Sequence, residues 1–139
     1  MPSSLEADIA VVGAGPAGAA LALALARLDY RVAVVALPRR FEACEGISER
    51  ALAGMREAGF SRALAGLAPP SPRRVEWNGV QRSANSERLL ARASFDRGLW
   101  ADLQEAGIAC IAARAERIDA QPDGAMLVRW AQGLLRARL

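Results

Sequence analysis

The chain has 139 residues, of which 53% are apolar and 24% are charged. This balance excludes a disordered chain and predicts one globular domain, residues 1–139, with little length left for a separate substrate domain. All 18 basic residues are Arg, acidic residues are interleaved with them, and the formal net charge is only +3. The charge pattern therefore indicates no nucleic-acid partner.

The sequence contains no His, which excludes Ser-His-Asp and Cys-His nucleophiles and any His-ligated metal. Cys44 and Cys110 are far apart and form no C-x-x-C pair, so we expect no metal site and a reducing, cytoplasmic location. The apolar run from Ile9 to Ala26 follows a segment without basic residues and contains three Gly and a Pro. We therefore expect neither a signal peptide nor a membrane span.

The first third of the chain predicts a strand, a helix and a second strand. Residues 8–12 and 31–36 are short apolar runs rich in Val, typical of strands that are buried on both faces. Residues 16–28 between them are rich in Ala and Leu and predict a helix that ends at Asp29. Two such strands joined by one helix form a right-handed βαβ unit with a parallel sheet.

The rest of the chain predicts two helices and a group of short strands. Ser48 caps a helix over residues 48–58, and a second helix over residues 94–106 ends at Gly107. Between them, residues 68–74 form a proline-rich connector, and residues 75–85 alternate weakly, as in an edge strand or hairpin. Segments 108–113, 116–121, 126–130 and 134–139 predict a β-meander, so the fold class is α/β.

One motif carries a specific chemistry. The pattern G-x-G-x-x-G directly follows the first predicted strand and opens the predicted helix, and its residues are Gly13, Ala14, Gly15, Pro16, Ala17 and Gly18. The first Gly permits a tight turn, the second lets a pyrophosphate approach the backbone, and the third lets the helix pack closely on the strand. The motif predicts dinucleotide binding at the helix N-terminus; the alternative is a turn that packs strand on helix without a ligand.

The end of the second strand departs from the usual dinucleotide pattern. An Asp or Glu that binds the ribose hydroxyls is expected there, and this chain has Ala36 and Leu37 instead. Ribose binding is then weakened or moved to neighbouring groups, or Arg39 and Arg40 accept the 2′-phosphate of NADP. A further alternative is that these two Arg residues only solvate a loop.

The residues from Asp8 to Gly18, with Ala22 four positions further on, resemble the opening of FAD-dependent oxidoreductases. The similarity continues in residues 45–60 and 89–96, which resemble the second and third conserved segments of the aromatic-hydroxylase, geranylgeranyl-reductase and tryptophan-halogenase-like flavoproteins. The resemblance implies a Rossmann-like FAD-binding domain with a parallel sheet. It covers nearly the whole chain but only the N-terminal third of that superfamily, so the domain is expected to be partial and truncated, and to hold AMP and pyrophosphate better than the isoalloxazine.

The resemblance also implies three cofactor-binding positions beyond the glycine motif. Arg92 corresponds to an Arg near the flavin phosphates and ribityl chain, and Glu45 and Gly46 correspond to a loop near the cofactor. The alternative is that Arg92 is a solvent-facing residue at a helix N-terminus and Glu45 a solvated loop acid. The three tryptophans, Trp77, Trp100 and Trp130, are interpreted as core or interface packing and are given no role in the site.

The resemblance implies an FAD-binding oxidoreductase of the flavin-dependent monooxygenase kind, of which the chain is the cofactor-binding portion. FAD is the expected cofactor, NADP or NAD is second to it, and NAD(P)H serves as reductant; no residue is an evident catalyst. The acceptor is a small aromatic, an isoprenoid or a protein side chain, as in hydroxylases that mature quinone cofactors. The alternatives are a module of a split flavoprotein completed by a C-terminal chain, an inactive truncated remnant, and an NADP-binding reductase domain.

Overall fold

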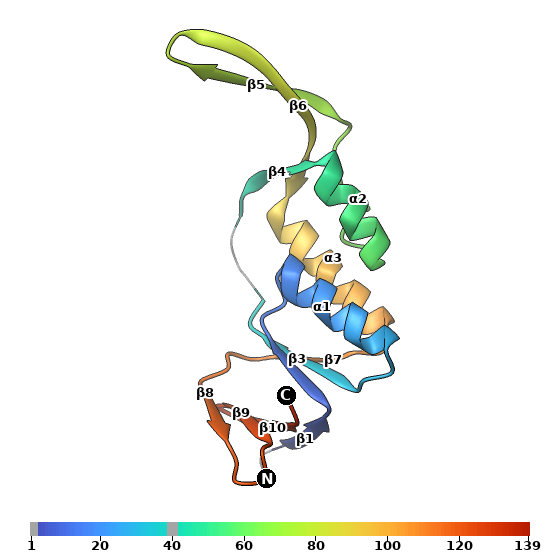
Figure 1. The fold of residues 1–139 in the computed structure, drawn as a ribbon, viewed down its shortest axis with the longest axis vertical. Coiled ribbons are helices and arrows are strands. Elements are labelled where there is room, and N and C mark those ends of the chain that lie inside the picture. Colours follow the sequence, from blue (N-terminus) through green and yellow to red (C-terminus); the bar gives the residue numbers. More distant parts are fainter. Residues whose placement is uncertain (1–2, 39–41) are drawn as a thin grey trace.

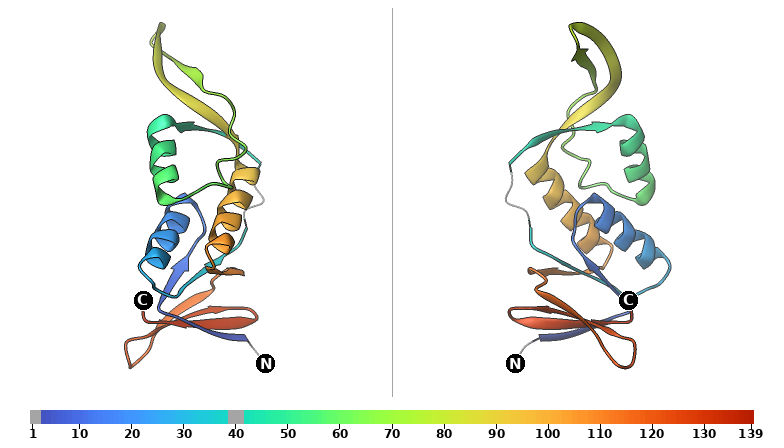
Figure 2. Two further views of the ribbon diagram at one scale, coloured as in Figure 1. Left: turned by 90° about the vertical axis from the view of Figure 1, so that its right-hand side faces the viewer. Right: turned by 60° about the vertical axis from the view of Figure 1, so that its left-hand side comes forward.

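The computed structural model describes residues 3–38 and 42–139. Its elements lie along one long axis, and the chain runs from one end to the other and back again (Figure 1). Three helices lie in the middle of the molecule. A four-stranded sheet lies at the end that carries both termini, and a long hairpin projects from the opposite end. The two further views show the same arrangement (Figure 2). The α/β class predicted from the sequence is confirmed.

The parallel sheet and its first crossover form as predicted. Strands β2 (Ile9–Val12), β3 (Val32–Ala36) and β7 (Ala109–Ala112) are parallel, with β3 in the centre. Helix α1 (Pro16–Arg27) connects β2 to β3. All five residues of β3 are buried, as expected for a central parallel strand. Asp29 adopts the left-handed conformation, with φ 63°, just beyond the end of α1.

Three strands differ from the expectation. β7 belongs to the parallel sheet and not to the meander, because the chain returns from a helix beside β3 in the same direction. β2 is not buried on both faces: Val12 is 49% exposed, and among the described residues only β3 pairs with β2 along its length. A further strand, β1 (Ser3–Ala7), precedes β2 and was not predicted.

The second sheet contains the predicted meander. Strands β8 (Arg117–Ala120), β9 (Met126–Trp130) and β10 (Gly133–Ala137) are antiparallel neighbours, and β1 pairs with β10 in parallel. Asp8 joins the two sheets: its carbonyl accepts hydrogen bonds from the amides of Arg138 and Leu139, and its carboxylate accepts two from the Arg31 side chain. The hydrogen bonds from Arg31 hold the pKa of Asp8 below its ordinary value.

The third sheet is antiparallel and consists of β4 (Cys44–Ser48), β6 (Val80–Ala91) and β5 (Ser71–Trp77), with β6 in the centre. β5 and β6 form the projecting hairpin, whose two-residue turn has positive φ at Asn78 and Gly79. This is the turn that Asn-Gly favours. The hairpin is longer than residues 75–85, and Pro72 of the expected connector lies on edge strand β5, next to a bulge.

Two helices complete the structure. α2 (Glu49–Ala58) begins at the predicted cap, where Ser48 Oγ accepts from the amide of Ala51. α3 (Arg92–Glu105) begins two residues before the expected Ser94. Its first amide, that of Arg92, donates to the carbonyl of Ala43 at 2.8 Å. A tertiary partner therefore takes the place of a side-chain cap at this helix start.

Helices α1 and α3 pack on the parallel sheet, and α2 packs on α1 and on strands β4 and β6. Leu52, Leu99 and Leu103 are fully buried in the core that they share. Each such leucine contributes about 1.5–3 kcal/mol of transfer free energy. Asp102 of α3 is 5% exposed, and its carboxylate accepts hydrogen bonds from the amides of residues 61–63 and from Ser61 Oγ. These bonds compensate the cost of burying the charge and fasten α3 to the segment after α2.

Gly18 sets the distance between α1 and the sheet. A Cβ at this position would collide with the carbonyl oxygen of Gly13. Replacing Gly18 with Val should therefore lower the free energy of unfolding by about 1–3 kcal/mol, because α1 must move away from β2.

Gly54→Ala is the matched control, since Gly54 lies in α2 with open space around it. This change should raise the free energy of unfolding by roughly 0.5–1 kcal/mol. Urea unfolding followed by circular dichroism compares the two variants. A Gly18→Val chain as stable as the wild type would show that this close approach is not needed.

Candidate functional site

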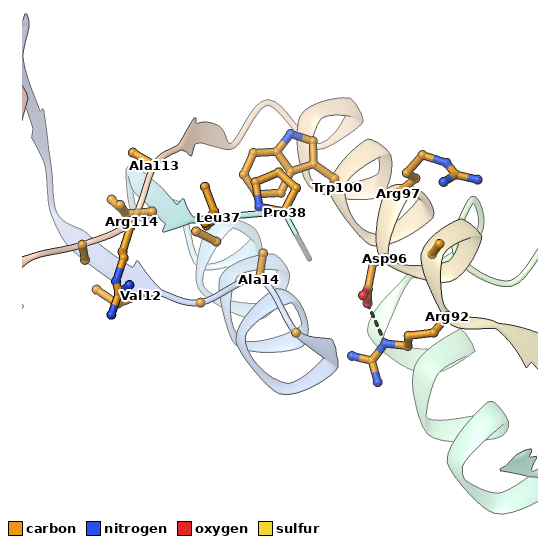
Figure 3. A pocket seen from close by; sticks show the side chains of 16 residues that line it. Val12, Ala14, Leu37, Pro38, Arg92, Asp96, Arg97, Trp100, Ala113 and Arg114 are labelled. Carbon is orange, nitrogen blue, oxygen red and sulfur yellow. Dashed lines mark hydrogen bonds and ion pairs between the residues drawn. The ribbon is translucent and has the colours of Figure 1, made fainter. Parts of the chain in front are cut away.

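A cavity of about 600 Å³ lies where the carboxyl ends of β2 and β3 meet the beginning of α1 (Figure 3). α3 and residues 113–115, which follow β7, form the other walls. The carboxyl edge of a parallel α/β sheet is the usual place for a ligand in this class of fold. The first three residues of the glycine motif line this cavity.

The first two glycines of the motif face this cavity. Gly13, Ala14 and Gly15 line it, and Gly13 has φ +108°, a conformation that favours glycine. Neither Gly13 nor Gly15 has any atom within 4 Å of the place where a Cβ would stand. The turn therefore leaves space for a bulky group to approach the backbone.

The N-terminus of α1 opens onto the same space. Gly15 is the N-cap, Pro16 is the first helical residue, and the first turn contains no acidic side chain. The helix dipole and the free amides of a first turn favour an anion at this point. Pro16, Ala17 and Gly18 do not line the cavity; they form the start of the helix, and Gly18 provides the close packing described above.

The end of β3 carries no charge. Ala36 and Leu37 both line the cavity, and Leu37 is 62% exposed. No carboxylate therefore stands where a ribose-binding acid is usual. Arg39 and Arg40, which could serve a 2′-phosphate, lie outside the described residues.

Arg92 lies on the opposite wall in an ion-pair cluster. Its Nε donates to Asp96 Oδ1 at 2.8 Å and its Nη1 to Glu45 Oε2 at 3.0 Å, and its side chain is 12% exposed. The hydrogen bond to Asp96 is the main reason that the pKa of Arg92 is raised above its ordinary value. Arg92 is thus a fixed cation, with part of its charge balanced by two carboxylates.

Only one of the two carboxylate oxygens of Asp96 is hydrogen-bonded within the described residues. Its Oδ2 is buried and has no hydrogen-bond partner among the described residues. A buried acceptor without a partner costs about 1–3 kcal/mol, so a hydroxyl donor on a bound molecule would be stabilising at this wall.

Glu45 and Gly46 lie on strand β4 rather than on the loop that was expected. Neither lines the cavity; Glu45 acts on it only through Arg92, and a Cβ at Gly46 would meet the carboxylate of Glu87. The expectation of a loop was wrong because β4 pairs with β6, a contact between residues more than 35 positions apart.

Four charged or aromatic residues of the cavity were not identified from the sequence: Asp96, Arg97, Trp100 and Arg114. Arg97 and Trp100 share α3 with Arg92, and their spacing in the sequence was the available signal. The other two tryptophans lie elsewhere, with Trp130 in the core of the second sheet and Trp77 76% exposed at the hairpin tip. Of the predicted core or interface packing, Trp130 fits the core, Trp77 does not lie in the core, and Trp100 also lines the cavity.

The described lining contains three cations, Arg92, Arg97 and Arg114, and one acid, Asp96. It fits an anionic dinucleotide such as FAD on three grounds: the glycine turn is open, the helix N-terminus favours phosphate, and the wall is net positive. No group of three or more potential metal ligands occurs within residues 3–38 and 42–139. None of the helices described there is long and apolar enough to cross a membrane.

No family model and no curated protein matches the chain. Among solved structures, it is similar to the peptidyl tryptophan dihydroxylase QhpG, which is essential for tryptophylquinone cofactor biogenesis. The identity is 46%, the TM-score is 0.83, and the match covers 96% of this chain and 31% of QhpG.

Two more distant structures share the fold. PqsL, a probable FAD-dependent monooxygenase from Pseudomonas aeruginosa, has 23% identity and a TM-score of 0.70, over 96% of this chain and 41% of that protein. A geranylgeranyl bacteriochlorophyll reductase-like protein from Thermoplasma acidophilum has 18% identity and a TM-score of 0.69, over 98% and 38%. The chain thus spans about a third of the length of these proteins. The chain is similar in sequence and fold to part of the dihydroxylase QhpG and in fold to part of the probable FAD-dependent monooxygenase PqsL, and it corresponds to a partial, cofactor-binding portion of such proteins.

Proposed function

We propose that this chain, as one partial domain, binds FAD in the cavity at the start of α1, as the cofactor site of a flavin-dependent hydroxylase. The observation that carries the proposal is the open turn at Gly13 and Gly15, which faces a net positive cavity at a helix N-terminus. The diphosphate has two negative charges to place there. The likeness in fold to PqsL, a probable FAD-dependent monooxygenase, supports a flavoprotein over an unliganded packing turn.

The residues around the cavity have distinct roles in this proposal. Gly13, Ala14 and Gly15 receive the pyrophosphate through their backbone, while Pro16, Ala17 and Gly18 position the helix that faces it. Arg92 and the unpartnered Asp96 Oδ2 form a wall suited to a polyol, with Glu45 fixing the Arg92 guanidinium. Gly46 takes no part in binding; it allows β4 to pass the Glu87 side chain.

FAD is favoured over NADP because PqsL, which shares the fold, is described as a probable FAD-dependent monooxygenase. Bound flavin supplies the redox chemistry that activates dioxygen, while the protein holds and orients it. We place the protein in the cytoplasm, because Cys44 and Cys110 are both free.

The acceptor site belongs, in this proposal, to the part of the related proteins that the chain does not cover. The cavity contains Asp96 as its one described carboxylate, already paired with Arg92, and no other described side chain there could serve as a general base near neutral pH. We propose a peptidyl tryptophan as acceptor, because the chain is 46% identical to QhpG, a peptidyl tryptophan dihydroxylase. The missing part is supplied by further residues of the same protein or by a complementing chain.

The cofactor site is tested by Gly15→Ala. The new Cβ stands in open space and does not disturb the fold, but it faces the cavity. If it blocks one charge-assisted hydrogen bond to phosphate, the affinity for FAD should fall about 10- to 100-fold in an anisotropy titration.

Gly54→Ala, away from the cavity and also in open space, serves as the control and should bind FAD like the wild type. Unchanged affinity in Gly15→Ala, with the fold intact by circular dichroism, would place the cofactor elsewhere.

The proposal that this chain holds the cofactor but not the acceptor site is tested by supplying the FAD-loaded chain with reduced nicotinamide, dioxygen and a tryptophan-containing peptide. We expect no oxygen incorporation into the peptide by mass spectrometry, because the chain holds the cofactor and not the acceptor site. A hydroxylated peptide formed by this chain alone would contradict that division.

A further inference from the structure

The cavity changes character along helix α3. Arg92, Asp96 and Trp100 are spaced four residues apart, so they lie on one face of the helix, and all three line the cavity. From Arg92 to Trp100 the helix rises about 12 Å. The same wall therefore presents an ion pair at one end and an indole ring at the other.

Apolar residues also line the cavity near Trp100. Figure 3 shows Pro38 and Leu37 close to the indole, Ala113 and Arg114 beyond Leu37, and Arg92 and Asp96 on the other side of the cavity. An aromatic base loses little by leaving water for such a surface, whereas a polyol would lose hydrogen bonds. The two ends thus suit the two ends of a dinucleotide: a base beside Trp100 and a hydroxylated chain beside Arg92 and Asp96.

The Trp100 side chain is well held. Its neighbour Leu99 is fully buried, Gly98 packs directly on the Ala63 backbone, and Trp100 itself packs partly against the same core. A ring fixed in this way loses little further rotamer freedom when a ligand stacks on it. Trp100 is also half-buried, so part of the ring stays open to the cavity.

The usual polar anchor for the ribose is absent from this end. Ala36 and Leu37 replace the acid at the end of β3, and Asp96, the one described carboxylate of the lining, is engaged by Arg92 at 2.8 Å. Recognition of the adenosine half must then come from another contact. The indole offers the largest aromatic surface among the described lining residues.

We propose that Trp100 is the residue on which the adenine ring stacks, and that this contact, rather than a ribose carboxylate, makes the site select FAD over FMN. The proposal rests on the cofactor site proposed above and adds its specificity. When an aromatic side chain that stacks on a base is replaced by alanine, the affinity for the ligand falls about 5- to 100-fold.

The test compares FAD, ADP and FMN as ligands of four chains: wild type, Trp100→Leu, Trp100→Phe and Trp77→Leu. Trp100→Leu keeps apolar volume but removes the aromatic face, and Trp100→Phe keeps an aromatic face. Trp77 lies at the exposed hairpin tip and does not line the cavity, so Trp77→Leu is the matched control. Affinities are measured by calorimetry.

We expect Trp100→Leu to weaken FAD and ADP about 10-fold or more and to leave FMN unchanged. Trp100→Phe should recover most of the loss, and Trp77→Leu should match the wild type. A second readout does not depend on folding of the Leu variant: ADP should change the tryptophan emission of the wild type and of Trp77→Leu, but not that of Trp100→Phe.

Two results would overturn the inference while the cofactor site stands: FAD and ADP bind Trp100→Leu as tightly as the wild type, or FMN weakens by the same factor as FAD. A wild-type chain that binds neither FAD nor ADP would instead reject the cofactor site itself, and the role of Trp100 with it.

Discussion

The whole site depends on one close contact, that of helix α1 with the turn that precedes it. Because Gly18 has no side chain, α1 can lie against the carbonyl of Gly13 at the end of β2. This approach brings the helix N-terminus and the open face of Gly15 to the edge of the parallel sheet. Without it, the amides and the dipole of the first turn would point away from the cavity. Gly18 thus sets the packing of the helix, and Gly13 and Gly15 leave the turn open for the proposed ligand.

The second determinant is helix α3, which gives the cavity its chemistry. Its inner face is held in place by Leu99 and Leu103 and by the Asp102 carboxylate bound to the amides of residues 61–63. With that face fixed, Arg92, Asp96 and Trp100 line the cavity. The wall they form is polar at one end and aromatic at the other, which gives an elongated ligand a direction. The cavity therefore has features suited to the two ends of a dinucleotide as well as to its phosphates.

Much of this structure can be predicted from the sequence, because its signals are local. The apolar strand at residues 32–36, the glycine motif and the cap at Ser48 each depend on neighbours in the chain. The Asn78-Gly79 turn is also a local signal for the hairpin. The weak alternation of apolar and polar residues around it does not indicate how long the two strands are.

What could not be predicted depends on contacts between distant residues. β4 is a strand only because β6 pairs with it, and Glu45 reaches Arg92 only through that pairing. Likewise, the spacing of Arg92, Asp96 and Trp100 marks one helix face, but periodicity alone does not tell which face meets the cavity and which meets Ala63. The exposed side of β2 was not predicted for the same reason. A short apolar run has the same sequence pattern whether its strand lies in the centre or at the edge of a sheet.

The most direct test of the account is the visible absorption spectrum of the chain after incubation with FAD and removal of free flavin by desalting. The account predicts that flavin absorption remains with the protein in near-equimolar amount, because the glycine turn, the cationic wall and the aromatic end all contact the cofactor. Folded protein that emerges free of flavin at every FAD concentration would contradict it.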